Sequence, residues 1–452
     1  MTLRWPWQAR STPAPPVRVP TLNRTASHAA DHAPRAPRAR VEPVLLPPGE
    51  AFTPTQPKPG RRQIVGRQAE LQRIVQALRE EKAHVVLYTE RGRGKTSLAN
   101  LVIEALRQGG VIVARHACEA GSSFDSIMRG LLRDLPRALL ATPANDPSEV
   151  GCEAALPQGM LRPRDVVGVM ARLTCRTLVC VVDEFDRVED EGTRTRLADT
   201  IKQLSDQAVP LSFMVVGVSE NLEQILGQHP SIQRNLVAVQ LPLLTDAEVA
   251  SVIETGARQA GFTLFESAVE YVAALSRGSP YMAQLMGLRL IQATRERGSA
   301  AVAPEDFAAA ITRLLNETSP RTKAIHASLT QGGGDPEMVR TLATLAMAEQ
   351  DSWGRFKVMP SFRDAVSVGQ TYITAERWAR ILASQVVRSA GEGYGLHAFA
   401  ERSVMHHILL LAARDAPAEA KPDAGRPAGR GGPVAEPAQP GQAAPSQMAV
   451  GT

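Results

Sequence analysis

The sequence is poor in aromatic residues and cysteines, and it has no long apolar run. Phe, Trp and Tyr make up 4% of the 452 residues although 44% are hydrophobic, a composition that favours helices around a small sheet over an all-β fold. The four cysteines (Cys118, Cys152, Cys175 and Cys180) form no C-x-x-C pair and have no histidine at zinc spacing, which indicates reduced thiols. Because no apolar stretch approaches the roughly 20 residues that cross a bilayer, we expect no membrane-spanning helix.

The amino terminus lacks the apolar segment of a secretory signal. It is rich in arginine and poor in acidic residues, as transit peptides are, but its many prolines would break the amphipathic helix that such peptides need. We therefore expect a cytoplasmic protein.

The formal charge of +5 is unevenly distributed. Residues 1–62 hold nine Arg and one Lys against three acidic residues, so the rest of the chain is slightly acidic. A high isoelectric point is then weak support for nucleic-acid binding by the folded part. Residues 1–60 (Pro, Ala and Arg) and 413–452 (Ala, Pro and Gly) show no apolar period, and we expect both to be disordered tails.

Between the tails, short apolar runs alternate with helical patterns. We expect strands at 84–88, 111–114, 177–182, 211–218 and 236–241, helices at 71–78, 124–140, 164–173 and 189–207, and a loop insertion at 141–164. Fully apolar strands alternating with helices predict an α/β domain over 61–244, a parallel sheet covered on both faces.

The remainder of the chain has mainly helical periods. Residues 245–318 predict a helical domain, and 335–412 predict a mostly helical C-terminal domain. Within the latter we expect helices at 338–348 and 375–388, a strand or wing at 391–399, and a last helix ending near Leu411.

A glycine-rich segment joins the first expected strand to a helix, the context of a phosphate-binding P-loop. Gly92 and Gly94 allow a tight turn, and the helix that follows adds the positive end of its dipole. Lys95 is then expected on the β- and γ-phosphates of ATP, and the Thr96 hydroxyl on Mg²⁺. The expected binding residues are Glu90, Arg91, Gly92, Arg93, Gly94, Lys95, Thr96 and Ser97. Thr89 stands where the pattern has glycine, and an ordinary charged strand–helix turn is the alternative.

Asp183 and Glu184 follow a buried strand, at the edge of the sheet where ligands bind. We expect Asp183 to hold Mg²⁺ through its water shell, and Glu184 to polarise the attacking water. The alternative is an acidic loop that caps the following helix.

Two further residues are candidates for a catalytic role. Ser219 follows the strand that ends at Val218 and is placed to sense the γ-phosphate, or else it caps a helix at 220–226. Arg234 precedes the last strand, where it would act on the nucleotide of a neighbouring subunit in a homo-oligomer, or be a plain surface arginine.

With these residues the chain resembles AAA+ ATPases, in particular the origin-recognition/Cdc6-like and STAND-like branch. The segment Ile64–Leu71 (IVGRQAEL) resembles the VGR…EL motif at the start of that domain, which implies adenine contacts at Val65 and Gly66. The resemblance also implies a helical lid from Thr245 and a winged-helix domain at the C-terminus. Pro280 or Tyr281 stands where many relatives carry a sensor arginine, which is a departure from the pattern.

These features leave several functions open. The first is an ATP-driven switch acting on DNA or a DNA-associated protein, with Arg377, Arg380 and Arg388 as phosphate contacts. The second is a STAND-like signalling ATPase that binds a protein, and the third is a nucleotide-binding scaffold without turnover. A small-molecule kinase is disfavoured, because a glutamate beside the metal aspartate suits water activation.

Overall fold

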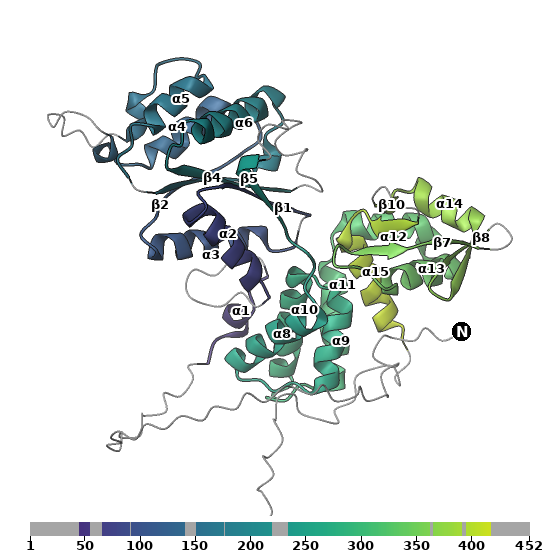
Figure 1. The fold of residues 1–452 in the computed structure, drawn as a ribbon. Helices are drawn as coiled ribbons and strands as arrows, with labels where there is room; N and C mark the ends of the chain where they lie inside the picture. The colour runs from purple at the N-terminus through teal and green to yellow at the C-terminus, as the bar shows by residue number, and fades with distance from the viewer. Residues whose placement is uncertain are drawn as a thin grey trace, which may run out of the picture.

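The computed structural model describes residues 45–54, 66–90, 92–140, 151–175, 177–218, 234–361, 365–390 and 395–416. It has a five-stranded parallel sheet with helices on both faces, then a bundle of helices, then a C-terminal part of helices and small sheets (Figure 1). The expected fold class is confirmed. None of the helices in the described part combines the length and apolar character that a membrane crossing requires.

The sheet has the order β2-β3-β4-β1-β5, and every neighbouring pair is parallel. Helices α2 and α3 cover one face, and α4, α5 and α6 cover the other (Figure 1). Alternate strand residues point into two separate cores, with Val85 and Leu87 on the side of α3 and Val86 on the opposite side. Both faces are therefore buried, which explains the continuous apolar runs. The elements are β1 (His84–Thr89), β2 (Ile112–Ala117), β3 (Leu178–Asp183), β4 (Leu211–Val218), β5 (Leu236–Gln240), α2 (Gln68–Arg79), α3 (Lys95–Gln108), α4 (Phe124–Arg133), α5 (Pro163–Met170) and α6 (Glu191–Asp206).

Two expectations for this domain need correction. The helix expected at 124–140 ends at Arg133, because Pro136 cannot continue it, and only a short 3₁₀ turn follows. The expected insertion is more than a loop. Its described part includes a 3₁₀ turn at Cys152–Ala155 and α5 from Pro163, and it buries Leu156 and Leu161. Residues 141–150 and the helix expected at 220–226 lie outside the described residues.

The helical bundle consists of α8 (Asp246–Ala260), α9 (Glu266–Ser276), α10 (Pro280–Glu296) and α11 (Pro304–Glu317). Its first helix begins where the sequence indicates. Thr245 accepts a hydrogen bond from the Glu248 backbone N–H, and Glu248 reaches back to the Thr245 N–H, which forms a capping box. Gly261 ends this helix with φ of 82°.

Residues 45–54 are not part of a disordered tail, so the expectation for 1–60 is wrong in this segment. They include the short helix α1 (Pro48–Ala51), and Phe52 is only 1% exposed. The Phe52 ring fills a space left by Gly256 of α8 and Gly287 of α10, since a Cβ at either glycine would lie 2.4 Å from the ring. The buried ring of Phe52 anchors this segment to the bundle. Because a single aromatic residue makes this contact, the sequence shows no apolar periodicity that would predict it.

The C-terminal part is mostly helical, as expected. It contains α12 (Pro320–Thr330), α13 (Pro336–Met347), α14 (Ala375–Ala383) and α15 (Arg402–Arg414). It also has two antiparallel sheets, β7 (Met359–Ser361)-β8 (Ala365–Val368)-β9 (Thr371–Thr374) and β10 (Val387–Ser389)-β11 (Leu396–Phe399)-β6 (Arg355–Lys357). The helix expected to reach Arg388 stops at Ala383, and Gln385 at φ of 57° turns the chain into β10. The expected strand near Phe399 is present as β11.

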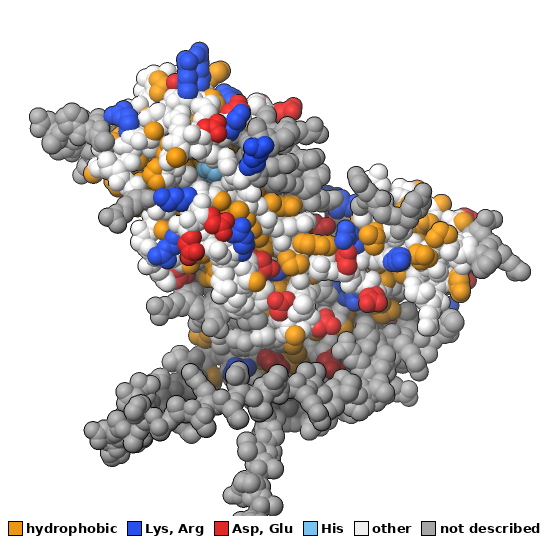
Figure 2. Space-filling view, in the orientation of Figure 1, with side chains coloured by type: hydrophobic (Ala, Val, Ile, Leu, Met, Phe, Trp, Pro, Cys, Tyr) orange, Lys and Arg blue, Asp and Glu red, His pale blue; other side chains and the backbone are white. Residues whose placement is uncertain are grey.

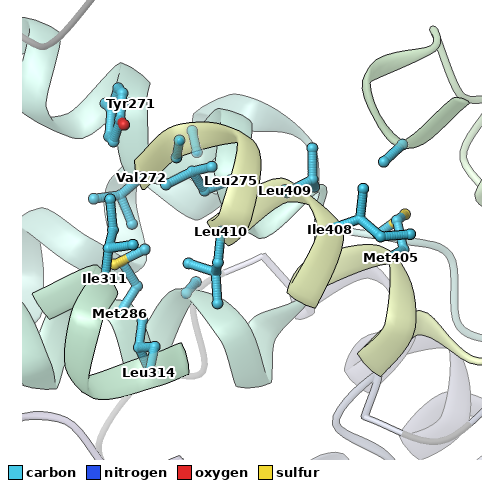
Figure 3. Packing of buried hydrophobic residues seen from close by; sticks show 14 of the residues in the cluster. Tyr271, Val272, Leu275, Met286, Ile311, Leu314, Met405, Ile408, Leu409 and Leu410 are labelled. Carbon is cyan, nitrogen blue, oxygen red and sulfur yellow. The ribbon is translucent and has the colours of Figure 1, made fainter. Parts of the chain in front are cut away.

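The bundle and the C-terminal part share one hydrophobic core. Helix α15 lies against α9 and α11, and its side chains interdigitate with theirs (Figure 3). The residues labelled there are Tyr271, Val272, Leu275, Met286, Ile311 and Leu314 from the bundle, and Met405, Ile408, Leu409 and Leu410 from α15. Because the sheet domain has its own two cores, the chain divides into the sheet domain and a joint helical unit.

Candidate functional site

The glycine-rich loop runs from Thr89, at the end of β1, to Lys95, the first residue of α3. Gly92 has φ of 80° and Gly94, the N-cap of α3, has φ of 89°. Both are in the left-handed region that other residues rarely adopt, which explains glycine at both positions. The loop therefore presents the amino end of a fourteen-residue helix at the carboxyl edge of the sheet, an arrangement suited to an anion. Arg91 lies outside the described residues.

Lys95 folds back over this loop. Its Nζ donates to the carbonyl oxygens of Thr89, at 3.2 Å, and Glu90, at 3.1 Å. Phosphate oxygens are acceptors of the same kind and carry charge, so they can replace these carbonyls as stronger partners. Thr96 is exposed and Ser97 half-buried in the first turn of α3, where hydroxyls can reach a bound anion or its metal.

Thr89 is compatible with the loop although the motif has glycine here. Its φ is not in the left-handed region, so the strain anticipated for a β-branched residue does not arise. The side chain is 1% exposed, and its hydroxyl donates to the Leu241 carbonyl at 3.0 Å. Thr89 thus ties the loop to the segment that leaves β5 for the helical bundle.

Arg93 connects the loop to the C-terminal part. It is 3% exposed and donates to the Leu241 carbonyl at 3.2 Å, to the Glu90 carboxylate at 2.7 Å and to the Trp353 carbonyl at 2.8 Å. The other carboxylate oxygen of Glu90 lies 3.7 Å from the Arg388 guanidinium. A side chain between the two loop glycines therefore contacts both Leu241, in the segment that follows β5, and Trp353, in the C-terminal part.

The turn at residues 352–354 collects further contacts around Arg93. The Leu243 N–H donates to the Ser352 carbonyl at 2.7 Å. Arg402, from α15, donates to the Arg277 carbonyl at 2.6 Å and packs against Gly354, where a Cβ would lie 2.4 Å from its guanidinium. Burial lowers the pKa of Arg402 to about 10, and the neighbouring Arg93 contributes to that shift. This junction of sheet domain, bundle and C-terminal part is rich in buried positive charge.

Asp183 and Glu184 stand at the end of β3. Asp183 is 3% exposed, and its Oδ1 accepts the Glu184 N–H at 2.9 Å. Glu184 has φ of 53° and pairs with Arg187 at 2.9 Å while remaining about half-exposed. The cap of α6 is Asp190, which accepts from the Gly192 and Thr193 N–H groups. Helix capping therefore does not account for the Asp183–Glu184 pair.

Arg115 is a site residue that the sequence reasoning missed. β2 extends past Ala114 to Ala117, and Arg115 donates to Asp183 Oδ2 at 2.5 Å and to the Asn100 side chain of α3 at 2.8 Å. The sequence does contain a signal for this role. Arg115 lies near the carboxyl end of β2, and β2 is the neighbour of β3, the strand that ends in Asp183.

The remaining expected residues are distributed more widely. Gly66, with φ of 80°, lies against Glu248 of α8, where a Cβ would be 2.9 Å from that side chain. Arg234 is exposed just before β5. Tyr281 is 42% exposed in the first turn of α10, and it directly follows Pro280 in the sequence. Val65 and Ser219 lie outside the described residues.

The donors at this edge suit a hard divalent cation carried by a polyphosphate. Asp183 and Thr96 offer oxygen ligands, which Mg²⁺ prefers. The described residues contain no group of three or more His, Cys, Asp or Glu that could hold a metal without help, so phosphate oxygens and water would complete the shell. Burial, and then the charge of Asp183, raise the pKa of the Cys118 thiol to about 12, so this thiol stays protonated.

The arginines expected to contact DNA phosphates are paired within the chain. Arg377 bonds Glu337, and Arg380 bonds Asp335 at 3.2 Å and the Leu329 carbonyl at 3.0 Å. On the face drawn in Figure 2, basic and acidic side chains are interspersed over the described surface, without a continuous basic stretch.

One family model matches most of the sheet domain. Residues 63–216 match the family described as AAA ATPase domain. No curated protein matches the chain significantly.

The solved structures that resemble this chain include the following three. A single-residue variant of RuvB from Thermotoga maritima has 14% identity and a TM-score of 0.43, covering 76% of this chain and 94% of that one. Orc1 of Aeropyrum pernix, solved in complex with DNA, has 18% identity and a TM-score of 0.41, with coverages of 79% and 95%. Cdc6p of Pyrobaculum aerophilum has 12% identity and a TM-score of 0.44, with coverages of 83% and 100%.

Proposed function

We propose, from the premise that residues 63–216 are an AAA ATPase domain, that this chain is an ATP-hydrolysing switch whose phosphate loop controls the joint helical unit. The observation that carries the proposal is Arg93, which lies between Gly92 and Gly94 and donates to the Trp353 carbonyl at 2.8 Å. Any rearrangement of the loop around a triphosphate acts on this contact.

The binding roles follow the loop. Lys95 would hold the β- and γ-phosphates, and the N–H groups at the start of α3 would surround them. Thr96 and Asp183 would hold Mg²⁺, which neutralises phosphate charge when bound. Gly66 would lie beside the adenine near the first turn of α8, since it already packs against Glu248.

The hydrolytic roles fall on Glu184 and residues near it. Glu184 is about half-exposed at the edge of the sheet and would orient water toward the γ-phosphate. Ser219 would sense that phosphate from the end of β4, and Arg234 would act across a subunit interface in a homo-oligomer. Lys95→Ala should abolish nucleotide binding, whereas Glu184→Gln should keep binding and stop turnover. Equal hydrolysis by Glu184→Gln and the parent would remove that residue from its role.

The fluorescence of Trp353 can measure the coupling between the phosphate loop and the C-terminal part. In a protein with Trp5, Trp7 and Trp378 changed to Phe, Trp353 is the sole tryptophan, and ATP with Mg²⁺ should change its emission. Arg93→Ala should retain nucleotide binding but lose this change, because the loop then no longer touches the Trp353 carbonyl. A matched protein that keeps only Trp378, which packs against His397 inside the C-terminal part, should respond little. An unaltered Trp353 response in Arg93→Ala would reject the coupling.

The partner of the C-terminal part is best proposed as a protein, including one bound to DNA. A duplex approaching Arg377 and Arg380 would also meet Glu337 and Asp335, whose charges repel phosphate. Direct DNA binding is the other outcome of a mobility-shift assay across a salt series. Affinity that persists without residues 1–62 and falls steeply with salt would establish a DNA role for the folded part.

A further inference from the structure

Arg115 spans two elements of the proposed nucleotide site. One end of its guanidinium contacts Asn100, and the other contacts Asp183 Oδ2. Asn100 lies four residues after Thr96 on α3, so the two side chains share a helix face. The guanidinium therefore crosses from the helix that carries one proposed metal ligand to the strand that carries the other.

The pairing changes the charge that a metal would meet. Asp183 is nearly fully buried, and both its carboxylate oxygens already accept hydrogen bonds, one from Arg115 and one from the Glu184 N–H. A positive charge fixed 2.5 Å from Oδ2 cancels much of the negative potential that would attract a divalent cation. Salt screens such a partly buried pair only weakly.

We propose that Arg115 is a positioning residue that sets the divalent-metal affinity of this site. It holds Asp183 in place and, by its charge, keeps the site from binding a divalent metal until a nucleotide supplies further negative charge. The inference rests on the proposed nucleotide site and adds to it an order of binding, in which metal enters together with the triphosphate.

Arg115→Gln tests whether the positive charge of Arg115 lowers the affinity of the site for a divalent metal. Glutamine keeps an amide near Asn100 and Asp183 but removes the positive charge, so the buried carboxylate becomes a stronger ligand. With Mn²⁺ alone as the probe, electron paramagnetic resonance at pH 7.5 should show an affinity about tenfold higher than in the parent. Mn²⁺ without nucleotide should also raise the Tm of Arg115→Gln more than that of the parent, because the metal binds only the folded site.

The matched control is Arg107→Gln, which makes the same charge change in the last turn of α3. Arg107 donates to the Val113 carbonyl at 3.4 Å, from an exposed position, and its loss should leave Mn²⁺ affinity at the parent value. Arg115→Lys keeps the charge and should also behave as the parent does.

Two outcomes overturn the proposal. One is Mn²⁺ affinity in Arg115→Gln equal to that of the parent, and the other is a gain in Arg115→Lys as large as in Arg115→Gln, which would exclude charge as the cause. If Arg115→Gln does not fold, Arg115→Ala, which also removes the positive charge, takes its place in both comparisons. These measurements contain no nucleotide, so they are separate from the test of ATP binding by the parent.

Discussion

The ring of Phe52 offers a quantitative test of how residues 45–54 are held to the bundle. Phe52→Ala removes a side chain that is 1% exposed and leaves its space between α8 and α10. The glycines on either side have no side chains that could collapse into the cavity. We therefore expect a loss of about 3–5 kcal/mol in the free energy of unfolding of the joint helical unit, the range for a buried Phe truncation.

The glycines make the prediction more specific. Gly256→Ala places a Cβ 2.4 Å from the Phe52 ring, and such overpacking should destabilise the parent by about 1–3 kcal/mol. In the Phe52→Ala background the same substitution meets an empty space. There the better helix propensity of alanine should stabilise the protein by up to about 1 kcal/mol.

Urea unfolding followed by circular dichroism and by Trp378 fluorescence measures both effects, since Trp378 belongs to the same core. The deciding observation is the sign of the Gly256→Ala effect in the two backgrounds. A destabilisation of equal size with and without the ring would refute the packing described for Phe52.

Three other outcomes follow from the structure. Arg234→Ala should lower ATP turnover only if the protein assembles; sedimentation and turnover measured together check this, and full activity of the variant in an assembled protein would contradict it. Thr89→Gly restores the motif glycine but loses the bond to Leu241, which should weaken the attachment of residues 241–245 to the loop by about 1 kcal/mol and speed proteolysis there; unchanged cleavage would contradict it. Burial lowers the pKa of His406 to about 3, and its Nε2 lies 3.1 Å from the Ser276 carbonyl. The unfolded chain therefore binds the proton more readily, and stability present above about pH 6.5 should fall by up to about 1.4 kcal/mol per pH unit below it. His406→Gln should reduce that slope in urea titrations at pH 5 and 7.5, and an identical slope would argue against a buried neutral imidazole.

The parallel sheet and the phosphate loop could be predicted because their signals are local. Apolar runs such as 177–182 and 211–218 mark strands buried on both faces, and Gly92, Gly94 and Lys95 are close together in the sequence. Asp183 could be expected beside the loop, because strand ends in a parallel sheet meet at one edge.

The contacts that link the parts of the chain could not be predicted in this way. Arg93 meets Trp353 across 260 positions, and Arg115 meets Asp183 across 68, through side chains whose direction no periodicity encodes. The strands between residues 355 and 374 are three or four residues long, too short for an alternating pattern to stand out.

The interior that α15 shares with α9 and α11 limits how the chain can be recombined. Replacing the C-terminal part with that of a related chain would exchange half of a packed interior, so substitutions on α15 must be matched by substitutions on the bundle. Chimeras joined near residue 325 should therefore aggregate. Those joined near residues 241–245 should keep both interiors intact when residues 45–54 come from the same parent as the bundle, because Phe52 packs between α8 and α10.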